Sequence, residues 1–552
     1  MLKFHDTNLE FDFDRHVKNL KKRVQDRAIS DAALYSVVFP NKTVHIFYFL
    51  EDNQLCGIPE IHSFESVTSD IFEGNYFHHI TVSPNKQGGK KDEANSFEDG
   101  DIYVALPFAE NPNFNACVKG PKKRLHNYVY HRFPEFYDSR RQKFFDEQAI
   151  TLKKRNTHGK IEKQVSIFNP MAYMGGQIKN AQSITQQLNP EGRPVAVIGM
   201  HWLDTGGAES CALEALEAAH EAGFLTICIT DRRGKEILYN RADKASDYIF
   251  QLDSTLPDNL WRQFYSNLLY LLDVKILHIH HCASMFENLP LIKAISPKTK
   301  VISSTHIIEF QDSGFCRISG VYANYIDIQH VISKELSAYY AEEFQVTKDR
   351  IDLSYLVHGE SRIEEPHPKP HKELREKCRL LFVGRMAQQK RPYLIANIAQ
   401  KLMKEKLDFS ITMVGGGDML ELTKKHAENL GVDHLIDFRG NLDHQAVKEQ
   451  MNNHHILLLP SQNEGLALVC YEATMAGVVA ISCDVGSQNE LISEELLVSR
   501  HTYSCIKETA NAVKRLAGDE SFYTAAFSEQ VKKFNVIAGS KNYDQFLREQ
   551  YK

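Results

Sequence analysis

The chain has 552 residues, of which 43% are hydrophobic and 25% charged, so it can form two or three globular domains with sizeable cores. Its formal net charge of -6 excludes a whole-chain preference for nucleic acid. The 10 cysteines are scattered without a CxxC pair, which excludes a disulfide scaffold and is typical of reduced core thiols in a cytoplasmic protein.

Residues 1–190 are predicted to form an α+β N-terminal extension. The N-terminal segment of the sequence contains no apolar region of the kind found in secretory signals, so we expect the protein to stay in the cytoplasm. A charged passage over 136–154 is predicted to be helical. Short β-like runs precede it, at 33–38, 43–49, 79–82 and 102–106.

One segment of the extension, 119–132, interleaves basic and aromatic residues. A solvated face is the favoured interpretation of this pattern, and contact with an anionic acceptor or with the inner face of a membrane is the alternative. The candidate role of the whole extension is recognition of an acceptor or a partner.

Apolar strands alternate with helical segments throughout the rest of the chain. The first set is VAVIGM, LTICIT, ILHIHH and VISS. The second set lies at 380–383, 411–414, 435–438, 456–459 and 478–482. This alternation is typical of βαβ units with a parallel sheet, so we predict two tandem Rossmann-like domains at 191–359 and 360–520 that face each other across a cleft.

The longest weakly polar stretch, 465–483, approaches the length that would span a bilayer. It contains Glu472 and Gly477 and divides into a helix and a strand. No transmembrane segment is therefore expected.

The run PSQNEGLALVCYEATMAG carries the most informative pattern, with Glu464 and Glu472 eight residues apart after an apolar strand. A strand, a turn and a helix over 466–476 present free N–H groups and a positive dipole end, which suit a diphosphate. Glutamates at this spacing also occur by chance. Glu472 lies in a nearly all-apolar segment, and a carboxylate is rarely buried without a partner or a task.

Other residues at predicted strand ends admit two interpretations each. Gly207, after the first strand, allows close approach to an anion or simply a tight helix start. Arg385 and Lys390 could neutralise a diphosphate or could be solvated charges. The glycines 415–417 form either a flexible turn over a ligand or a plain tight turn.

Histidines lie along one predicted strand of the first domain and at the end of another. His306 would point toward the cleft, although a lone histidine is more often structural. His278, His280 and His281 suggest a metal site only weakly, because neighbouring residues of a strand face opposite sides and no other ligand stands at a recognisable spacing.

Taken in order, GGAES, THIIE, VGRMAQQK, MVGGGD, FRGNLDHQAV and PSQNEGLALVCYEATMAG resemble the retaining glycosyltransferases of family 4, which have the GT-B fold. The resemblance covers roughly residues 193–552. It implies that the first domain lies on the acceptor side and the second on the donor side of the cleft. It also implies that 521–552 form a last helix that crosses back to the first domain.

The resemblance implies a catalytic set of Glu464, Arg385, Lys390 and His306. The two cations would bind the donor diphosphate and stabilise it as it leaves, Glu464 would face the sugar hydroxyls, and His306 would lie near the donor sugar. Further donor contacts are implied for Gly207, Gly416, Arg439, Gly465, Leu466, Ala467 and Glu472, with Arg439 at the base and Glu472 at the ribose.

The implied reaction is hexosyl or N-acetylhexosaminyl transfer with retained anomeric configuration, from a nucleotide-diphosphate sugar and without a metal or other cofactor. A UDP-sugar is favoured from family frequency, and the acceptor is a glycan, a lipid-linked glycan, a protein or a small metabolite. Two positions depart from the family pattern. Arg391 stands where a glycine commonly follows the lysine, and VHGES at 357–361 replaces an asparagine-glycine turn.

Two other functions are compatible with the sequence. One is a catalytically silent GT-B subunit that binds glycans or serves as a scaffold, and the other is a sugar-nucleotide epimerase of the same fold. Charged donor contacts are retained, and this argues for an enzyme over a silent subunit; they are Arg385, Lys390, Glu464 and Glu472.

Overall fold

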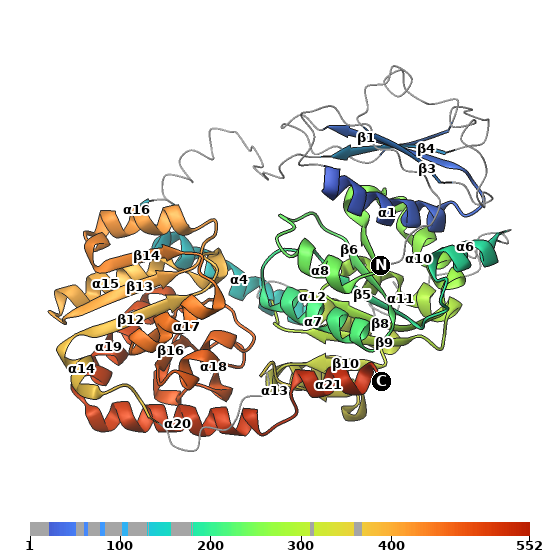
Figure 1. Cartoon of the computed structure of the whole chain (residues 1–552). Coiled ribbons are helices and arrows are strands. Elements are labelled where there is room, and N and C mark those ends of the chain that lie inside the picture. Colours follow the sequence, from blue (N-terminus) through green and yellow to red (C-terminus); the bar gives the residue numbers. More distant parts are fainter. Residues whose placement is uncertain are drawn as a thin grey trace.

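The computed structural model describes residues 21–50, 60–63, 78–82, 102–108, 130, 132–155, 178, 180–309, 314–357 and 367–552. They form two parallel α/β domains, a small N-terminal sheet and the helices that pack around them (Figure 1). Most of the basic and aromatic segment 119–132, and the VHGES turn beyond Val357, lie outside the described residues. None of the described helices is both long and apolar enough to cross a bilayer.

A seven-stranded parallel sheet, in the order β11-β10-β9-β8-β5-β6-β7, forms the first domain. All residues of the central strands β5 and β6 are buried, because helices cover both faces of the sheet. The strands are β5 (Val195–Met200), β6 (Leu225–Thr230), β7 (Tyr248–Gln251), β8 (Val274–His280), β9 (Lys300–Thr305), β10 (Ile328–Val331) and β11 (Ile351–Leu353). The helices are α6 (Ala181–Leu188), α7 (Gly207–Glu221), α8 (Tyr239–Ala245), α9 (Leu252–Thr255), α10 (Trp261–Leu271), α11 (Ala283–Ile295), α12 (Gly314–Val321) and α13 (Lys334–Glu343).

The second domain repeats this plan with a six-stranded parallel sheet in the order β14-β13-β12-β15-β16-β17. Its strands are β12 (Cys378–Val383), β13 (Phe409–Val414), β14 (Ile436–Gly440), β15 (Ile456–Leu459), β16 (Val479–Cys483) and β17 (Leu497–Val498). Its helices are α14 (His371–Glu376), α15 (Tyr393–Lys404), α16 (Leu420–Leu430), α17 (His444–Asn453), α18 (Leu468–Met475), α19 (Thr502–Gly518) and α20 (Glu520–Ala538).

The C-terminal segment returns to the first domain as two helices instead of the single helix predicted over 521–552. α20 packs on α18 and β16 of the second domain, and α21 (Tyr543–Gln550) packs on α7 of the first (Figure 1). At the crossing, Tyr355 N donates to the Lys541 carbonyl at 3.0 Å and Tyr543 N donates to the Tyr355 carbonyl at 2.9 Å. The end of the first domain at Tyr355 is therefore hydrogen-bonded to the returning chain at residues 541–543. The architecture confirms the predicted GT-B fold class.

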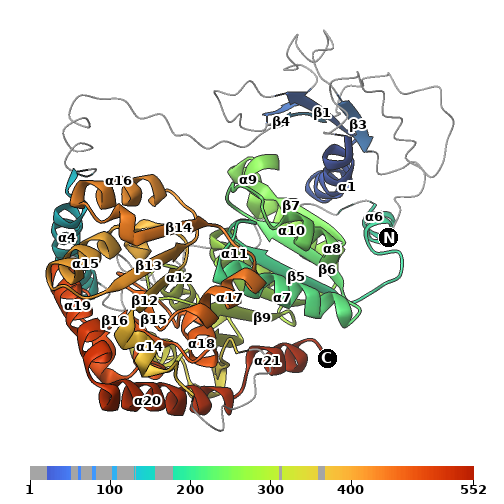
Figure 2. The same ribbon diagram turned by 60° about the vertical axis from the view of Figure 1, so that its left-hand side comes forward.

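The N-terminal extension contacts both domains. Its sheet has the order β2-β4-β1-β3, and α1 (Lys21–Val38) packs between that sheet and the first domain, against α10 and β7. α4 (Pro134–Arg155) lies instead along the second domain, beside α15 and α19 (Figure 2). The strands are β1 (Val44–Leu50), β2 (Glu60–Ser63), β3 (His78–Val82) and β4 (Ile102–Phe108).

The prediction of a strand over 33–38 is wrong, because these residues are the end of helix α1. Five of the six side chains are buried, all except Ser36. A short apolar run of this kind fits a helix buried between two layers as well as it fits a strand, so periodicity could not separate the two.

Candidate active site

The site lies at the carboxyl edge of the second sheet, where β12 and β15 are neighbours. After β12 the chain continues to β13 on one side of this pair, and after β15 it continues to β16 on the other side. The loops that follow β12 and β15 therefore diverge at the switch point of the sheet, the usual place for a ligand in such folds. Lys390 lies on the first of these loops and Glu464 on the second.

Lys390 and Glu464 form an ion pair across the switch point, with 2.5 Å between Nζ and Oε1. The Glu464 side chain is 6% exposed and the Lys390 side chain 20%, so one edge of the pair faces solvent. The loops are also joined directly, because Gln462 N donates to the Gln389 carbonyl and Gln389 Nε2 donates to the Asn463 carbonyl, each at 2.8 Å.

Glu472 lies apart from this pair, on the exposed side of α18. Its side chain is 32% exposed, and its Oε1 is 3.8 Å from Nδ1 of the exposed His444. The expectation of a buried carboxylate is wrong for Glu472, because the apolar neighbours belong to the other face of the helix. The buried carboxylate of the motif is Glu464.

The chain between the two glutamates leaves several amide groups open. α18 begins at Leu468, two residues later than predicted, so Gly465, Leu466 and Ala467 precede the helix in an extended turn. Within the described part of the chain, none of these three amides donates a hydrogen bond to a protein group. Open amides at the start of a helix form a ready anion-binding position.

The glycine run 415–417 is explained by close packing of the loops after β12, β13 and β14. A Cβ on Gly415 would overlap the Gly384 carbonyl, and a Cβ on Gly417 would lie 2.6 Å from the Met386 carbonyl oxygen. The Met386 amide in turn donates to the Gly416 carbonyl at 2.8 Å. The tight-turn interpretation therefore accounts for these glycines without a ligand.

Arg385 and Arg439, the remaining predicted donor residues of this domain, do not contact Lys390 or Glu464 in the described part of the chain. Arg385 is exposed and has no ion-pair partner among the residues that the structure describes. Arg439 lies on the edge strand β14, where it is exposed and pairs with Asp437 at 2.6 Å. Both guanidinium groups are accessible at the carboxyl edge of the sheet.

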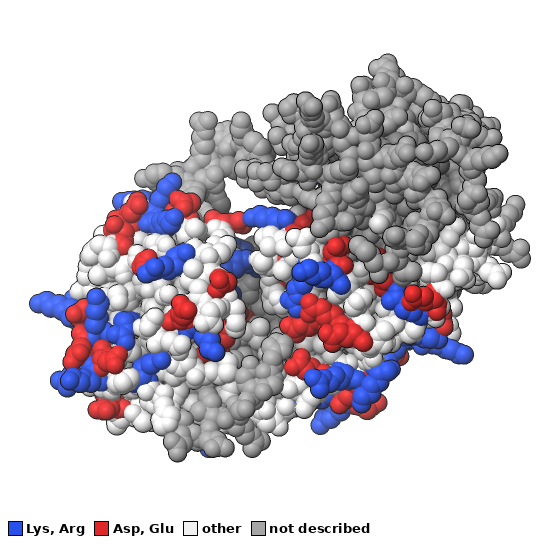
Figure 3. All heavy atoms as spheres, viewed as in Figure 1, with Lys and Arg blue, Asp and Glu red and all other residues white. Residues whose placement is uncertain are grey.

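The first domain meets the second at the Glu464 loop. A Cβ on Gly465 would overlap the His306 carbonyl oxygen, and Asn463 Nδ2 donates to the Ile308 carbonyl at 2.9 Å. On the face of the molecule shown in Figure 3, the surface is hollowed between the two domains. The backbone of His306 therefore lies against Gly465, the residue that follows Glu464 of the Lys390–Glu464 pair.

The His306 imidazole is buried, with only 7% of the residue exposed. Burial lowers the pKa of His306 to about 3, so the ring is neutral at pH 7. Neither ring nitrogen has a hydrogen-bond partner among the described residues. The ring centroid lies 5.8 Å from that of His280 and 5.3 Å from that of His281, so His306 belongs to a buried histidine cluster.

His278 has a structural role in this cluster. Its Nδ1 lies 2.8 Å from the Tyr551 hydroxyl and its Nε2 lies 2.7 Å from the Ser304 hydroxyl, so it ties β8 to the C-terminal segment. Across the described ranges, no three His, Cys, Asp or Glu side chains are grouped as a metal site would require.

Gly207 begins α7, and a Cβ there would meet nothing within 4 Å. The neighbouring Gly206 instead lies against the carboxylate of Glu209. That carboxylate accepts from Trp202 Nε1 at 2.6 Å and lies 3.1 Å from His201 Nε2. A negative side chain therefore occupies the first turn of α7 beside Gly207.

Two further residues of this region, Arg391 and Asp138, had no role predicted from the sequence. Arg391 follows Lys390 directly, is fully buried, and donates from Nε to the Pro460 carbonyl at 2.6 Å. Asp138 of α4 is also fully buried and lies 3.2 Å from Nη1 of Arg391. The only signal in the sequence was an arginine where a glycine commonly follows the lysine.

A family model described as "Glycosyl transferases group 1" matches residues 364–534, which hold β12 to β17 and the Lys390–Glu464 pair. These residues form a glycosyltransferase group 1 domain. The match begins before the first strand of the second sheet and ends within α20.

Known proteins are similar to parts of the chain. An O-antigen biosynthesis glycosyltransferase of Escherichia coli, WbnH, is 32% identical over 124 residues, which are 22% of this chain and 34% of that protein. An uncharacterized 41.2 kDa protein in the cps region of Klebsiella pneumoniae is 28% identical over 238 residues, 40% of this chain and 63% of that protein. The chain therefore spans less than two thirds of either relative.

Among solved structures, the Anabaena protein Alr3699/HepE in complex with UDP is similar, with a TM-score of 0.48 and 12% identity. The similarity covers 65% of this chain and 98% of that one.

Proposed function

We propose that this protein is a retaining glycosyltransferase that moves a hexosyl or N-acetylhexosaminyl group from a nucleotide-diphosphate sugar to an acceptor hydroxyl. A UDP-sugar is the favoured donor, because uridine nucleotides are the most frequent donors in the family that the sequence resembles. The glycosyltransferase group 1 domain supports the general class of reaction.

The observation that carries the proposal is the Lys390–Glu464 pair at the switch point of the second sheet. The Lys390 ammonium has an exposed edge and pairs with Glu464, which directly precedes the unpaired amides of Gly465, Leu466 and Ala467. A diphosphate bound at this edge would therefore meet both the cation and these amides. Arg385, exposed after β12, is within the same loop as Lys390 and would supply a second cation.

In the proposed reaction, the acceptor oxygen attacks the anomeric carbon on the face from which the diphosphate leaves. The bond from that carbon to the diphosphate oxygen breaks, its electron pair stays with the diphosphate, and the acceptor proton passes to that leaving group. Lys390 and Arg385 stabilise the developing charge, while Glu464 holds the sugar hydroxyls in place. The neutral His306 offers a hydrogen bond from the facing domain. We propose that two side-chain cations serve in place of a metal ion.

We further propose that the acceptor is a growing glycan or a lipid-linked glycan of a surface polysaccharide pathway. The name of the Escherichia coli relative, an O-antigen biosynthesis glycosyltransferase, supports this class of acceptor. A cytoplasmic location, with contact at the inner face of the membrane, would give access to both the soluble donor and such an acceptor.

The proposal is tested by thermal-shift and hydrolysis screens against a panel of sugar nucleotides, with Glu464→Ala and Lys390→Ala as site variants. Lys401→Ala, which removes a partly exposed, ion-paired lysine from α15, is the matched control. We expect at least one sugar nucleotide to stabilise the wild type and the control but neither site variant. Absence of any response in the wild type, or wild-type behaviour of both site variants, would overturn the donor site.

The anomeric configuration of the transferred sugar is a separate measurement, made by NMR on the product. Inversion would overturn the retaining mechanism and leave the donor site standing. A donor that binds and is only epimerised would favour the epimerase. A donor that binds without any turnover would favour the silent subunit.

A further inference from the structure

Helix α4 of the N-terminal extension packs directly behind the loops of the proposed donor site. Tyr130, just before the helix, donates its hydroxyl to Gln388 Oε1 at 2.8 Å, and Gln388 immediately precedes Gln389 and Lys390. Figure 2 shows the helix on the outer side of α15 and α19. Sequence alone offered acceptor or partner recognition as the role of the extension, whereas this part of it lies on the donor side.

Arg391 is the residue through which these loops are joined. It adopts a left-handed conformation, with φ 46°, at the end of the short 3-10 helix Gln388–Lys390. Its guanidinium donates to the carbonyls of Pro460 at 2.6 Å, Ser461 at 3.3 Å and Arg500 at 2.7 Å. One buried side chain thus links the Lys390 loop to the loop that carries Glu464.

Asp138 is the one carboxylate that an ion pair joins to this guanidinium within the described part of the chain. Its Oδ2 lies 3.2 Å from Arg391 Nη1 and accepts from the Thr502 hydroxyl at 2.9 Å, while its Oδ1 lies 3.5 Å from Gln388 Nε2. Both members of the ion pair are 0% exposed. Removing one partner of such a pair leaves an uncompensated charge in the interior.

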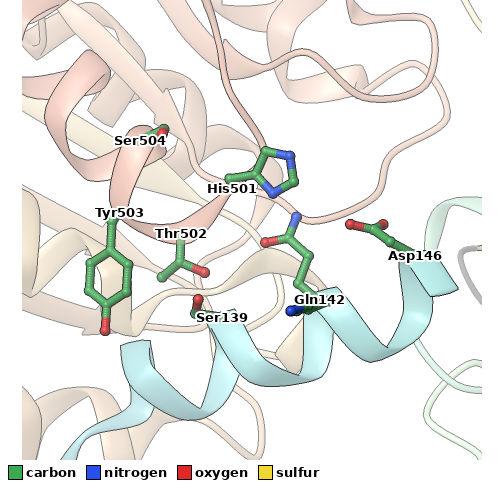
Figure 4. Close-up of a pocket in the computed structure, with 8 residues that line it drawn as sticks. Ser139, Gln142, Asp146, His501, Thr502, Tyr503 and Ser504 are labelled. Atoms are coloured by element: carbon green, nitrogen blue, oxygen red, sulfur yellow. The ribbon is translucent and has the colours of Figure 1, made fainter.

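The seam between α4 and α19 opens outward from this pair into a pocket. Ser139, Gln142 and Asp146 of α4 face His501 and Thr502 at the start of α19 (Figure 4). Gln142 Nε2 donates to the Arg500 carbonyl at 3.0 Å, and Asp146 pairs with the Arg500 side chain at 2.8 Å. The pocket is the solvent-accessible part of the contact between α4 and α19, whereas Asp138 is buried within that contact.

We propose that Asp138 is a positioning residue for the donor site, acting through Arg391 on the two loops that carry Lys390 and Glu464. The inference rests on the proposed function of those loops. Asp138 does not reach the ligand, so it acts by fixing where the ammonium of Lys390 and the amides after Glu464 stand. A displacement of about 1 Å at such groups is enough to lower the rate about 100-fold.

The test compares Asp138→Asn with Asp146→Asn, a matched change on the same helix at a partly exposed ion pair. Asp138→Asn is expected to weaken donor affinity at least about tenfold and to leave the acceptor KM within about twofold. Asp146→Asn is expected to change neither. Equal donor affinity of Asp138→Asn and wild type would overturn the inference.

Amide hydrogen exchange of residues 385–391 and 461–466 in the unliganded protein separates this inference from the proposed function. Faster exchange in Asp138→Asn, with no change in Asp146→Asn, supports positioning whether or not a donor binds. Unchanged exchange overturns positioning. A wild type that binds no sugar nucleotide overturns the proposed function instead.

An Arg391→Gly background keeps the test decisive if Asp138→Asn alone does not fold. Glycine suits the left-handed conformation at this position and removes the charge that Asp138 compensates. In that background, Asp138→Asn is expected to change donor affinity by less than about twofold. An equally large effect in both backgrounds would show that Asp138 does not act through Arg391.

Discussion

Replacing Lys390 should cost more stability than replacing Glu464, although the two side chains form one ion pair. In Lys390→Met the chain length is nearly kept, but the Glu464 carboxylate, 6% exposed, remains inside without its cation. Breaking a fully buried pair costs about 3–5 kcal/mol, and because the Lys390 end is 20% exposed we expect about 2–3 kcal/mol. In Glu464→Gln the ammonium left behind can reach water, so the expected cost is below about 1 kcal/mol.

Urea unfolding followed by far-UV circular dichroism measures both variants and the double variant. Both tryptophans, Trp202 and Trp261, belong to the first domain, so their fluorescence is an internal control for unfolding there. The double variant should be more stable than Lys390→Met, since no buried charge remains. Equal losses in the two single variants, or a double variant less stable than Lys390→Met, would refute the description of Glu464 as a buried, cation-dependent carboxylate.

Two other perturbations test the interface and the histidine cluster. Gly465→Ala places a Cβ against the His306 carbonyl, so it should separate the domains and lower kcat/KM at least about 100-fold, whereas Gly518→Ala, at an open position, should have no effect in the same assay. His306, with its pKa lowered by burial to about 3 against about 6.5 unfolded, stabilises the fold fully above pH 6.5 and progressively less as the pH falls toward 3. Wild type should therefore lose about 2 kcal/mol more unfolding free energy between pH 7 and pH 5 than His306→Gln. The control His444→Gln changes an exposed ring and should keep the wild-type pH dependence, and parallel curves for all three proteins would contradict the burial argument.

The parts of the fold that local pattern controls were predictable. Mostly apolar, fully buried strands such as β5 and β6 alternate with amphipathic helices, and that alternation is produced by a parallel sheet covered on both faces. Lys390 and Glu464 could be expected to meet because both follow strands of one sheet, and the carboxyl ends of parallel strands share an edge.

The parts that tertiary packing controls were not predictable from the pattern. The run at 33–38 is short enough to be a strand or a helix, and only its burial between two layers decides. Glu472 was expected to be buried, because the sequence does not say which face of α18 the domain covers. The Asp138–Arg391 pair joins residues that are 253 positions apart in the sequence, and no local sequence pattern predicts such a contact.

We propose that the Lys390–Glu464 edge of the second domain binds a nucleotide-diphosphate sugar. Isothermal titration calorimetry of wild type, Lys390→Met and Lys401→Met against UDP and a panel of UDP-sugars tests it most directly. We expect binding to wild type and to Lys401→Met, and binding at least about tenfold weaker in Lys390→Met, because a charge-assisted contact to the diphosphate is lost. Equal affinity of the three proteins, or no binding to wild type, would contradict it.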